Sequence, residues 1–125
     1  MIQTEDDVVI ALCSLLKSQG WTINKCCTGR QKGNDIEATK GKRFLIVEAK
    51  GSKGNLSHTI RKKFDSGQLK THLGKAIVKL LEQKTIYPNA ELAIAHPGSL
   101  FGDPAFRLVK QQLKRIGIRT YWVEK

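Results

Sequence analysis

A short apolar segment near the middle of the chain constrains the fold most strongly. Residues 44–47 read Phe-Leu-Ile-Val and follow the dipeptide Gly41-Lys42, which separates them from a second strand-like stretch, residues 34–40. An unbroken apolar run of this kind is typical of a central strand that is buried on both faces. A glycine in the first position of a two-residue loop fits a type II′ hairpin turn. We therefore predict an antiparallel hairpin with strands at residues 34–40 and 43–50.

Helical and strand patterns alternate on both sides of this hairpin. A helix is expected to begin after Thr4, which can act as its N-cap, and to end at Gly20. Residues 21–28 are expected to form a strand, and Asp65 or Ser66 to cap a long helix that ends before Pro88. The apolar stripes of the two helices are Val9, Leu12, Cys13 and Leu16, and Leu69, Leu73, Ala76, Ile77, Leu80 and Leu81.

The last third of the chain continues the alternation. Residues 90–96 and 118–123 are predicted strands, and one helix is expected between them, from Pro104 to Gly117. The resulting order is α-β-β-β-α-β-α-β. It predicts an α/β fold with a mixed sheet flanked by helices on both faces, formed by a single domain that covers residues 1–125.

Composition narrows the class of protein. The net charge is +11, from 22 Lys and Arg against 11 Asp and Glu, which favours nucleic acid as the partner. No apolar run is long enough for a membrane span, and the acidic N-terminus is unlike a secretory signal. The three cysteines, Cys13, Cys26 and Cys27, form no C-x-x-C pair. We therefore expect neither a disulfide scaffold nor a zinc site, and a cytoplasmic location.

The predicted hairpin brings acidic residues together. If Lys40 pairs with Arg43, the same register places Asp35 opposite Glu48. Two carboxylates about 4 Å apart repel by about 4 kcal/mol at an effective dielectric of 20, and a divalent cation would convert that repulsion into a binding site. Hard oxygen ligands without His or Cys suit Mg²⁺ or Mn²⁺. Lys50 lies on the same strand face as Glu48, where it could act on a metal-bound water or a phosphate.

The set Asp35, Glu48, Ala49 and Lys50 resembles the PD-(D/E)XK motif of a large nuclease superfamily, with Asn34 in place of the motif's Pro. The resemblance extends to the αβββαβ order over about residues 4–96, so it implies a restriction endonuclease-like core with a C-terminal helix and strand added. It also implies that Asp35 and Glu48 bind Mg²⁺ or Mn²⁺ and that Lys50 supports hydrolysis of DNA. Because resolvases and many restriction enzymes of this superfamily act as homodimers, a homodimer is consistent with the resemblance.

Three further residues are candidates for the site. Many superfamily members carry a Gln, or a Gln-x-x-x-Tyr motif, on the long helix; here Gln68 occupies that place and His72 replaces the Tyr. Some members use an acid from the first helix, which makes Glu5 a candidate, although stabilisation of the helix dipole explains the acidic first turn and is our preferred interpretation. Glu37 is the alternative metal ligand if the register is wrong by two residues.

Basic residues after the catalytic strand are the candidate phosphate contacts. They are Lys53, His58, Arg61, Lys62 and Lys63, and Lys75 adds to them from the long helix. Contacts of this kind position nucleic acid without reading its sequence. Gly51 and Gly54 would let the backbone approach a duplex closely. We expect His96, Trp21, Tyr121 and Trp122 to be structural, and we expect no small organic cofactor.

Two alternatives to a magnesium-dependent DNA endonuclease stay open. One is a nucleic-acid-binding module that keeps the nuclease fold without turnover, against which the intact Asp35, Glu48 and Lys50 set argues. The other is an interaction domain whose basic surface binds an acidic protein. A cleavage assay would separate the enzyme from both, and the salt dependence of DNA binding would then separate the two.

Overall fold

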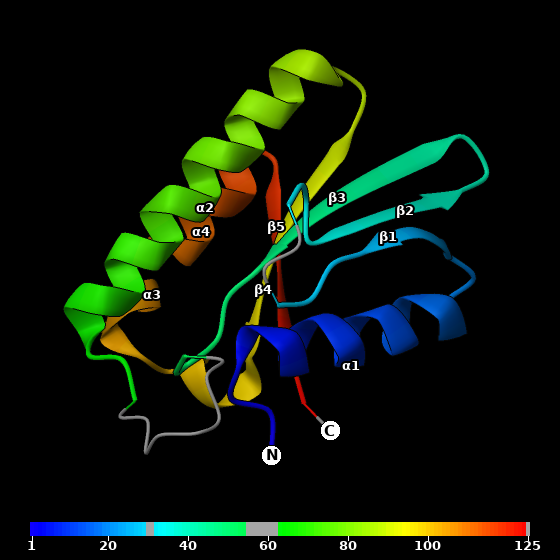
Figure 1. Cartoon of the computed structure of the whole chain (residues 1–125). Coiled ribbons are helices and arrows are strands. Elements are labelled where there is room, and N and C mark those ends of the chain that lie inside the picture. Colours follow the sequence, from blue (N-terminus) through cyan, green and yellow to red (C-terminus); the bar gives the residue numbers. More distant parts are fainter. Residues whose placement is uncertain (30–31, 55–62, 125) are drawn as a thin grey trace.

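One mixed sheet organises the chain, and its strands lie side by side in the order in which they occur in the sequence. The computed structural model describes residues 1–29, 32–54 and 63–124 (Figure 1). The strands are β1 (Thr22–Cys26), β2 (Ile36–Lys40), β3 (Arg43–Ala49), β4 (Glu91–Pro97) and β5 (Ile118–Val123). The first three are antiparallel neighbours, whereas β3, β4 and β5 are parallel to one another. This arrangement confirms the predicted α/β class and the mixed sheet.

The β2–β3 hairpin has the predicted register. Lys40 pairs with Arg43 and Ile36 with Val47, so the next position along places Asp35 beside Glu48. Gly41 has φ +61°, and among the described residues only glycines adopt a positive φ. A positive φ at the first loop position alone is the signature of a type II′ turn. The turn chemistry and the two-residue period therefore fix which side chains face each other.

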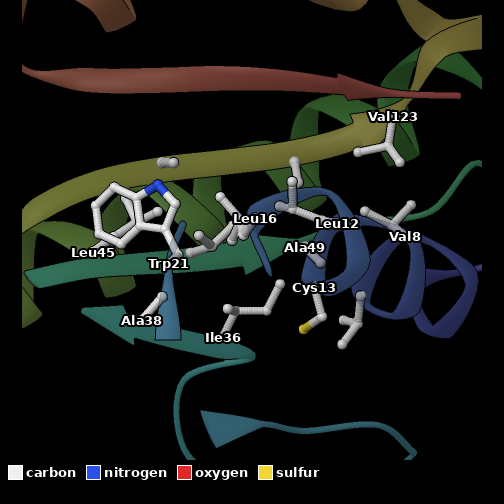
Figure 2. Close-up of a cluster of buried hydrophobic side chains, with 14 of the residues drawn as sticks. Val8, Leu12, Cys13, Leu16, Trp21, Ile36, Ala38, Leu45, Ala49 and Val123 are labelled. Carbon is white, nitrogen blue, oxygen red and sulfur yellow. The ribbon is translucent and has the colours of Figure 1, made fainter. Parts of the chain in front are cut away.

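Helix α1 (Glu5–Ser18) covers one face of the sheet (Figure 1). It begins with a capping box, in which Asp7 N donates to Thr4 Oγ1 and Thr4 N donates to the Asp7 carboxylate. Figure 2 shows its apolar stripe packed on residues from β2, β3 and β5. This cluster includes Val8, Leu12, Cys13, Leu16, Trp21, Ile36, Ala38, Leu45, Ala49 and Val123. Trp21 is thus a core residue, as predicted.

Helix α2 (Ser66–Ile86) lies on the opposite face, with Asp65 as its N-cap. Four of its predicted apolar positions are buried: Leu69, Leu73, Ala76 and Leu80. Ile77 packs partly buried beside them, but Leu81 is 45% exposed and does not belong to the stripe. Because α1 and α2 cover opposite faces, consecutive residues of β3 alternate between two separate cores, with Leu45, Val47 and Ala49 facing α1 and Ile46 facing α2.

Several element boundaries differ from the predictions by one or two residues, and two of the differences have a physical reason in the structure. The expected single helix after Pro104 is interrupted: it consists of α3 (Pro104–Arg107) and α4 (Lys110–Arg115), preceded by a 3-10 turn, η1 (Gly98–Leu100). Val109 N bonds to Phe106 O in an i to i−3 pattern, which interrupts the α-helical ladder. Strand β2 starts at Ile36 rather than at residue 34, because Asp35 bonds to β3 through its side chain and not through the backbone ladder.

Candidate active site

Two buried carboxyl groups meet where β2 begins and β3 ends. Asp35 is 9% exposed and Glu48 is 3% exposed. The backbone N–H of Ala49 donates to Asp35 Oδ2 at 2.8 Å, and this bond holds the Asp35 side chain against the end of β3. The register therefore brings together the first two residues of the predicted site.

The environment of the pair disfavours negative charge. Burial raises the pKa of Asp35, against the opposing effects of the Ala49 N–H and the positive charges of Lys79 and Lys50. Burial also raises the pKa of Glu48, and the neighbouring Asp35 charge raises it further. Carboxyl groups that share a site and lack full compensation by cations hold their protons more tightly. A bound cation would reverse this balance.

Lys79 of α2 is a site residue that the sequence pattern did not single out. Its Nζ lies 3.0 Å from Glu48 Oε1 and donates to the carbonyl of Gly33 at 2.8 Å. Glu48 Oε1 is fully buried, and Lys79 forms an ion pair with it. The available signal was helical spacing, because Lys79 shares a helix face with His72 and Lys75.

Lys50 leaves the end of β3 beside a small open cavity of about 200 Å³. Its backbone N–H bonds to Ala95 O of β4 at 2.9 Å, so the parallel pairing continues to this position. The cavity is lined by Glu5, Lys50, Gly51, Lys53, Gly54, Phe64 and His72. Two predicted site residues, Lys50 and Lys53, therefore reach one opening at the end of the sheet.

Glu5 joins this site because of a close backbone contact. A Cβ atom on Gly51 would lie 2.6 Å from Glu5 N and 2.7 Å from Gln3 O, so glycine is required where the chain crosses the start of α1. Ser52 N also donates to Gln3 O at 2.7 Å. Gly51 is buried, and its close approach is to the chain's own backbone rather than to a duplex, which corrects the expectation for this residue.

Burial, followed by the charge of Asp35, raises the pKa of Glu5 from 4.5 to about 7, with Glu48 and Asp6 adding to the effect and Lys50 opposing it. A helix dipole would lower this pKa. The preferred dipole interpretation does not account for the direction of this change. Because the charges of Asp35 and Glu48 act on Glu5, the three residues are called the acidic cluster below.

His72 is the contribution of α2 to the cavity wall. Its ring packs edge-on against Phe64, with centroids 4.5 Å apart. Burial lowers its pKa from 6.5, and the charges of Lys50 and Lys75 lower it further. The ring is therefore neutral at pH 7 and can either donate or accept a hydrogen bond at the cavity.

The structure gives Gln68 another role. Gln68 N donates to Asp65 Oδ1 and Asp65 N donates to Gln68 Oε1, so both groups are used in the capping box that begins α2. Gln68 is exposed and does not line the cavity.

The Asn34 amide, which stands in the place of the motif's Pro, donates to Glu37 Oε2 and to Gln83 Oε1, each at 3.0 Å. Glu37 itself lies opposite Ile46, not opposite Glu48.

The structure describes three of the remaining basic candidates. Lys63 and Lys75 are exposed, and Lys53 is half-buried at the cavity. His58, Arg61 and Lys62 lie outside the described residues.

His96 is 2% exposed and stacks on Trp122 at a centroid distance of 5.4 Å. Burial, and then the charge of Lys50, lower its pKa to about 3. It is thus a neutral core residue, as predicted.

No family model, curated protein or solved structure matches this chain. Within residues 1–29, 32–54 and 63–124, no helix is both long and apolar enough to cross a membrane. The same residues contain no group of three or more His, Cys, Asp or Glu side chains placed to hold a metal. Magnesium commonly takes only one or two carboxylates and fills its other positions with water and phosphate. The paired oxygens of Asp35 and Glu48 fit that requirement.

Proposed function

We propose that this chain is a Mg²⁺-dependent endonuclease that hydrolyses phosphodiester bonds in DNA. The single observation that supports it best is the buried Asp35–Glu48 pair, with Lys50 beside it at the mouth of a cavity. Carboxyl groups with raised pKa values are enriched at functional sites, and Lys50, two residues after Glu48, lines the cavity. Burying two carboxyl groups lowers the stability of the fold, which argues for a functional reason to keep them.

The arrangement of the elements supports a restriction endonuclease-like core. Helix α1 precedes an antiparallel β1–β2–β3 meander, and α2 then crosses over to β4, which lies parallel to β3. This is the αβββαβ order of the superfamily that the motif resembles. The α3–α4 and β5 segment extends the sheet by one parallel strand.

Asp35 and Glu48 are the residues that would hold the cation, through the carboxylate oxygens that face each other across the hairpin. When bound, Mg²⁺ or Mn²⁺ supplies charge stabilisation to the phosphate and a water of lowered pKa. Lys50 would donate hydrogen bonds to a phosphate oxygen on which negative charge grows. Glu5 and the neutral His72 stand on the cavity wall, where each can orient a water or a leaving oxygen.

The charge of the chain supports a polyanionic substrate. The net charge is +11, and the exposed Lys63 and Lys75 lie on segments that flank the cavity residues. Phosphate contacts of this type give affinity without sequence preference. The substrate is accordingly expected to be recognised by shape or by a partner subunit rather than by base contacts.

Cleavage of supercoiled plasmid with Mg²⁺, and with EDTA as the negative control, tests the proposal. Asp35→Asn and Glu48→Gln should each abolish nicking. Glu91→Gln is the matched control, because Glu91 is a carboxylate near the other end of the neighbouring strand, in ion pairs with Arg43 and Arg119. Circular dichroism of each variant checks the fold. Mg²⁺-dependent nicking that survives both site substitutions would refute the assignment, and DNA binding without nicking by the wild type would favour the non-catalytic module.

A further inference from the structure

Two cysteines from different elements lie within reach of each other. Cys13 is in the middle of α1 and Cys26 is the last residue of β1, and their sulfur atoms are 3.0 Å apart. Cys13 is 6% exposed in the cluster between α1 and the sheet (Figure 2), whereas Cys26 is exposed. One sulfur is thus held by the core and the other is open to reagents.

The separation is short for two unbonded thiols. A disulfide bond is about 2.05 Å long, so the sulfurs need to approach by only about 1 Å. The thiol is a weak hydrogen-bond donor and gives little energy of its own to hold such a contact. The packing of α1 on the sheet therefore sets the distance between the two sulfurs.

We propose that Cys13 and Cys26 form a site of reversible thiol oxidation, at which a small-molecule disulfide such as oxidised glutathione produces an intramolecular disulfide bond. This site is separate from the nuclease centre and does not depend on that assignment. It also differs from the disulfide scaffold that the sequence argued against, because both cysteines are free thiols in this structure.

The chemistry proceeds in two exchanges. The thiolate of exposed Cys26 attacks one sulfur of the small disulfide, forms a mixed disulfide, and releases one small thiol. Cys13 then loses its proton and attacks Cys26 Sγ, and the second small thiol leaves. Two electrons pass to the reagent, so two protein S–H bonds and one reagent S–S bond become one protein S–S bond and two thiols. Burial, and then the hydrogen bond to Cys26, raise the pKa of Cys13 to about 12, which makes Cys26 the first to react.

The bond would connect two elements that frame the active site. Cys26 pairs with Ile36, and the adjacent Cys27 N donates to Asp35 O at 2.8 Å. The helix that carries Cys13 begins with Glu5. Closing a loop of about 15 residues reduces the entropy of the unfolded chain, and we expect the melting temperature to rise by about 5–10 °C.

Mass spectrometry of the intact protein tests the proposal. The folded chain is equilibrated in glutathione buffers of graded ratio, quenched with acid and alkylated. We expect an oxidised species that carries one alkyl group instead of three, that is lighter by about a further 2 Da for the two lost thiol hydrogens, and that reverts when reduced glutathione is in excess. Cys26→Ser and Cys13→Ser should both abolish this species, and Cys13→Ser should leave Cys26 joined to glutathione. Cys27→Ser is the matched control and should keep the bond.

Three outcomes would overturn the proposal. One is a wild-type protein whose oxidation stops at the mixed disulfide on Cys26. Another is loss of the bond in Cys27→Ser, which would show that Cys27, and not the proposed pair, forms the bond. The third is no oxidised species at any ratio. If Cys13→Ser fails to fold, the Cys26→Ser variant still tests the proposal, because the exposed side chain of Cys26 is not part of the core.

Discussion

Replacing Glu5 with glutamine should stabilise the metal-free protein at pH 8, although acids in the first turn of a helix normally stabilise it. The pKa of Glu5 rises from 4.5 to about 7 on folding, because the carboxyl group is buried near Asp35 and Glu48. A pKa difference of one between the folded and unfolded chain corresponds to about 1.4 kcal/mol. The ionised side chain therefore costs at most about 3 kcal/mol at pH 8, and partial contact with water screens some of that cost. Glutamine keeps the shape and removes the charge.

The pH dependence follows from the direction in which the pKa changes. A group whose pKa is raised on folding contributes its full stability below the unfolded value of 4.5 and loses it as the pH rises through about 7. The advantage of Glu5→Gln should therefore be roughly 1–2 kcal/mol at pH 8, after screening and a lost dipole interaction of about 0.3–1 kcal/mol are subtracted. At pH 5 it should shrink below about 0.5 kcal/mol.

Urea denaturation in EDTA at pH 5 and pH 8 measures both values. Glu82→Gln is the matched control, because Glu82 is an exposed carboxylate on α2, and its unfolding free energy should change by less than about 0.5 kcal/mol. If the helix dipole is the dominant effect on Glu5, the sign reverses and Glu5→Gln is less stable at pH 8. That result would refute the placement of Glu5 in the acidic cluster.

Three further predictions follow from the site. Lys50→Ala should lose turnover yet keep Mg²⁺ affinity in titration calorimetry, since Lys50 acts on phosphate or water; loss of metal binding with turnover intact would reverse these roles. Gly51→Ala should lower the free energy of unfolding by about 1–3 kcal/mol, because the added methyl group overlaps the backbone at the start of α1. Gly74→Ala, at a helical position with open space, should not destabilise the protein in the same urea titration. Replacing Arg61, Lys62 and Lys63 with alanine should make the log–log salt dependence of DNA binding shallower by about 0.9 per lost contact. An unchanged slope would show that the three residues make no phosphate contacts.

The sequence predicted the register that brings Asp35 beside Glu48, because local rules determine it. Gly41 in a two-residue loop specified the turn. Counting along both strands from the turn then placed Asp35 opposite Glu48. The motif resemblance suggested that Gln68 belongs to the catalytic site, but a local capping interaction determines where its side chain lies. Its spacing from Asp65 is that of a capping box, and those short-range bonds determine its position.

Glu5 and Lys79 could not be placed in the same way, since their positions depend on how helices pack against the sheet. Glu5 reaches the site only because β3 exits through Gly51 across the start of α1. Lys79 reaches Glu48 because α2 packs its apolar stripe on the face that Glu48 shares with Ile46. Helical spacing indicated that Lys79 lies on the same side as His72, but it carried no information on which strand residue would face it.

A comparison of two ion-paired carboxylates shows why the acidic cluster is more than a structural salt bridge. Glu91 lies 2.8 Å from Arg43 and 2.9 Å from Arg119, and its hydrogen bond to Arg43 holds its pKa below 4.5. Glu48 also has a cation within 3.0 Å, yet burial and the Asp35 charge keep its pKa raised. The first group is fully compensated by its partners, as expected for a bridge that supports the fold. The second lies in a water-poor site where ionisation is disfavoured, and either a proton or a further cation relieves that penalty, which is the physical basis for proposing a metal ion there.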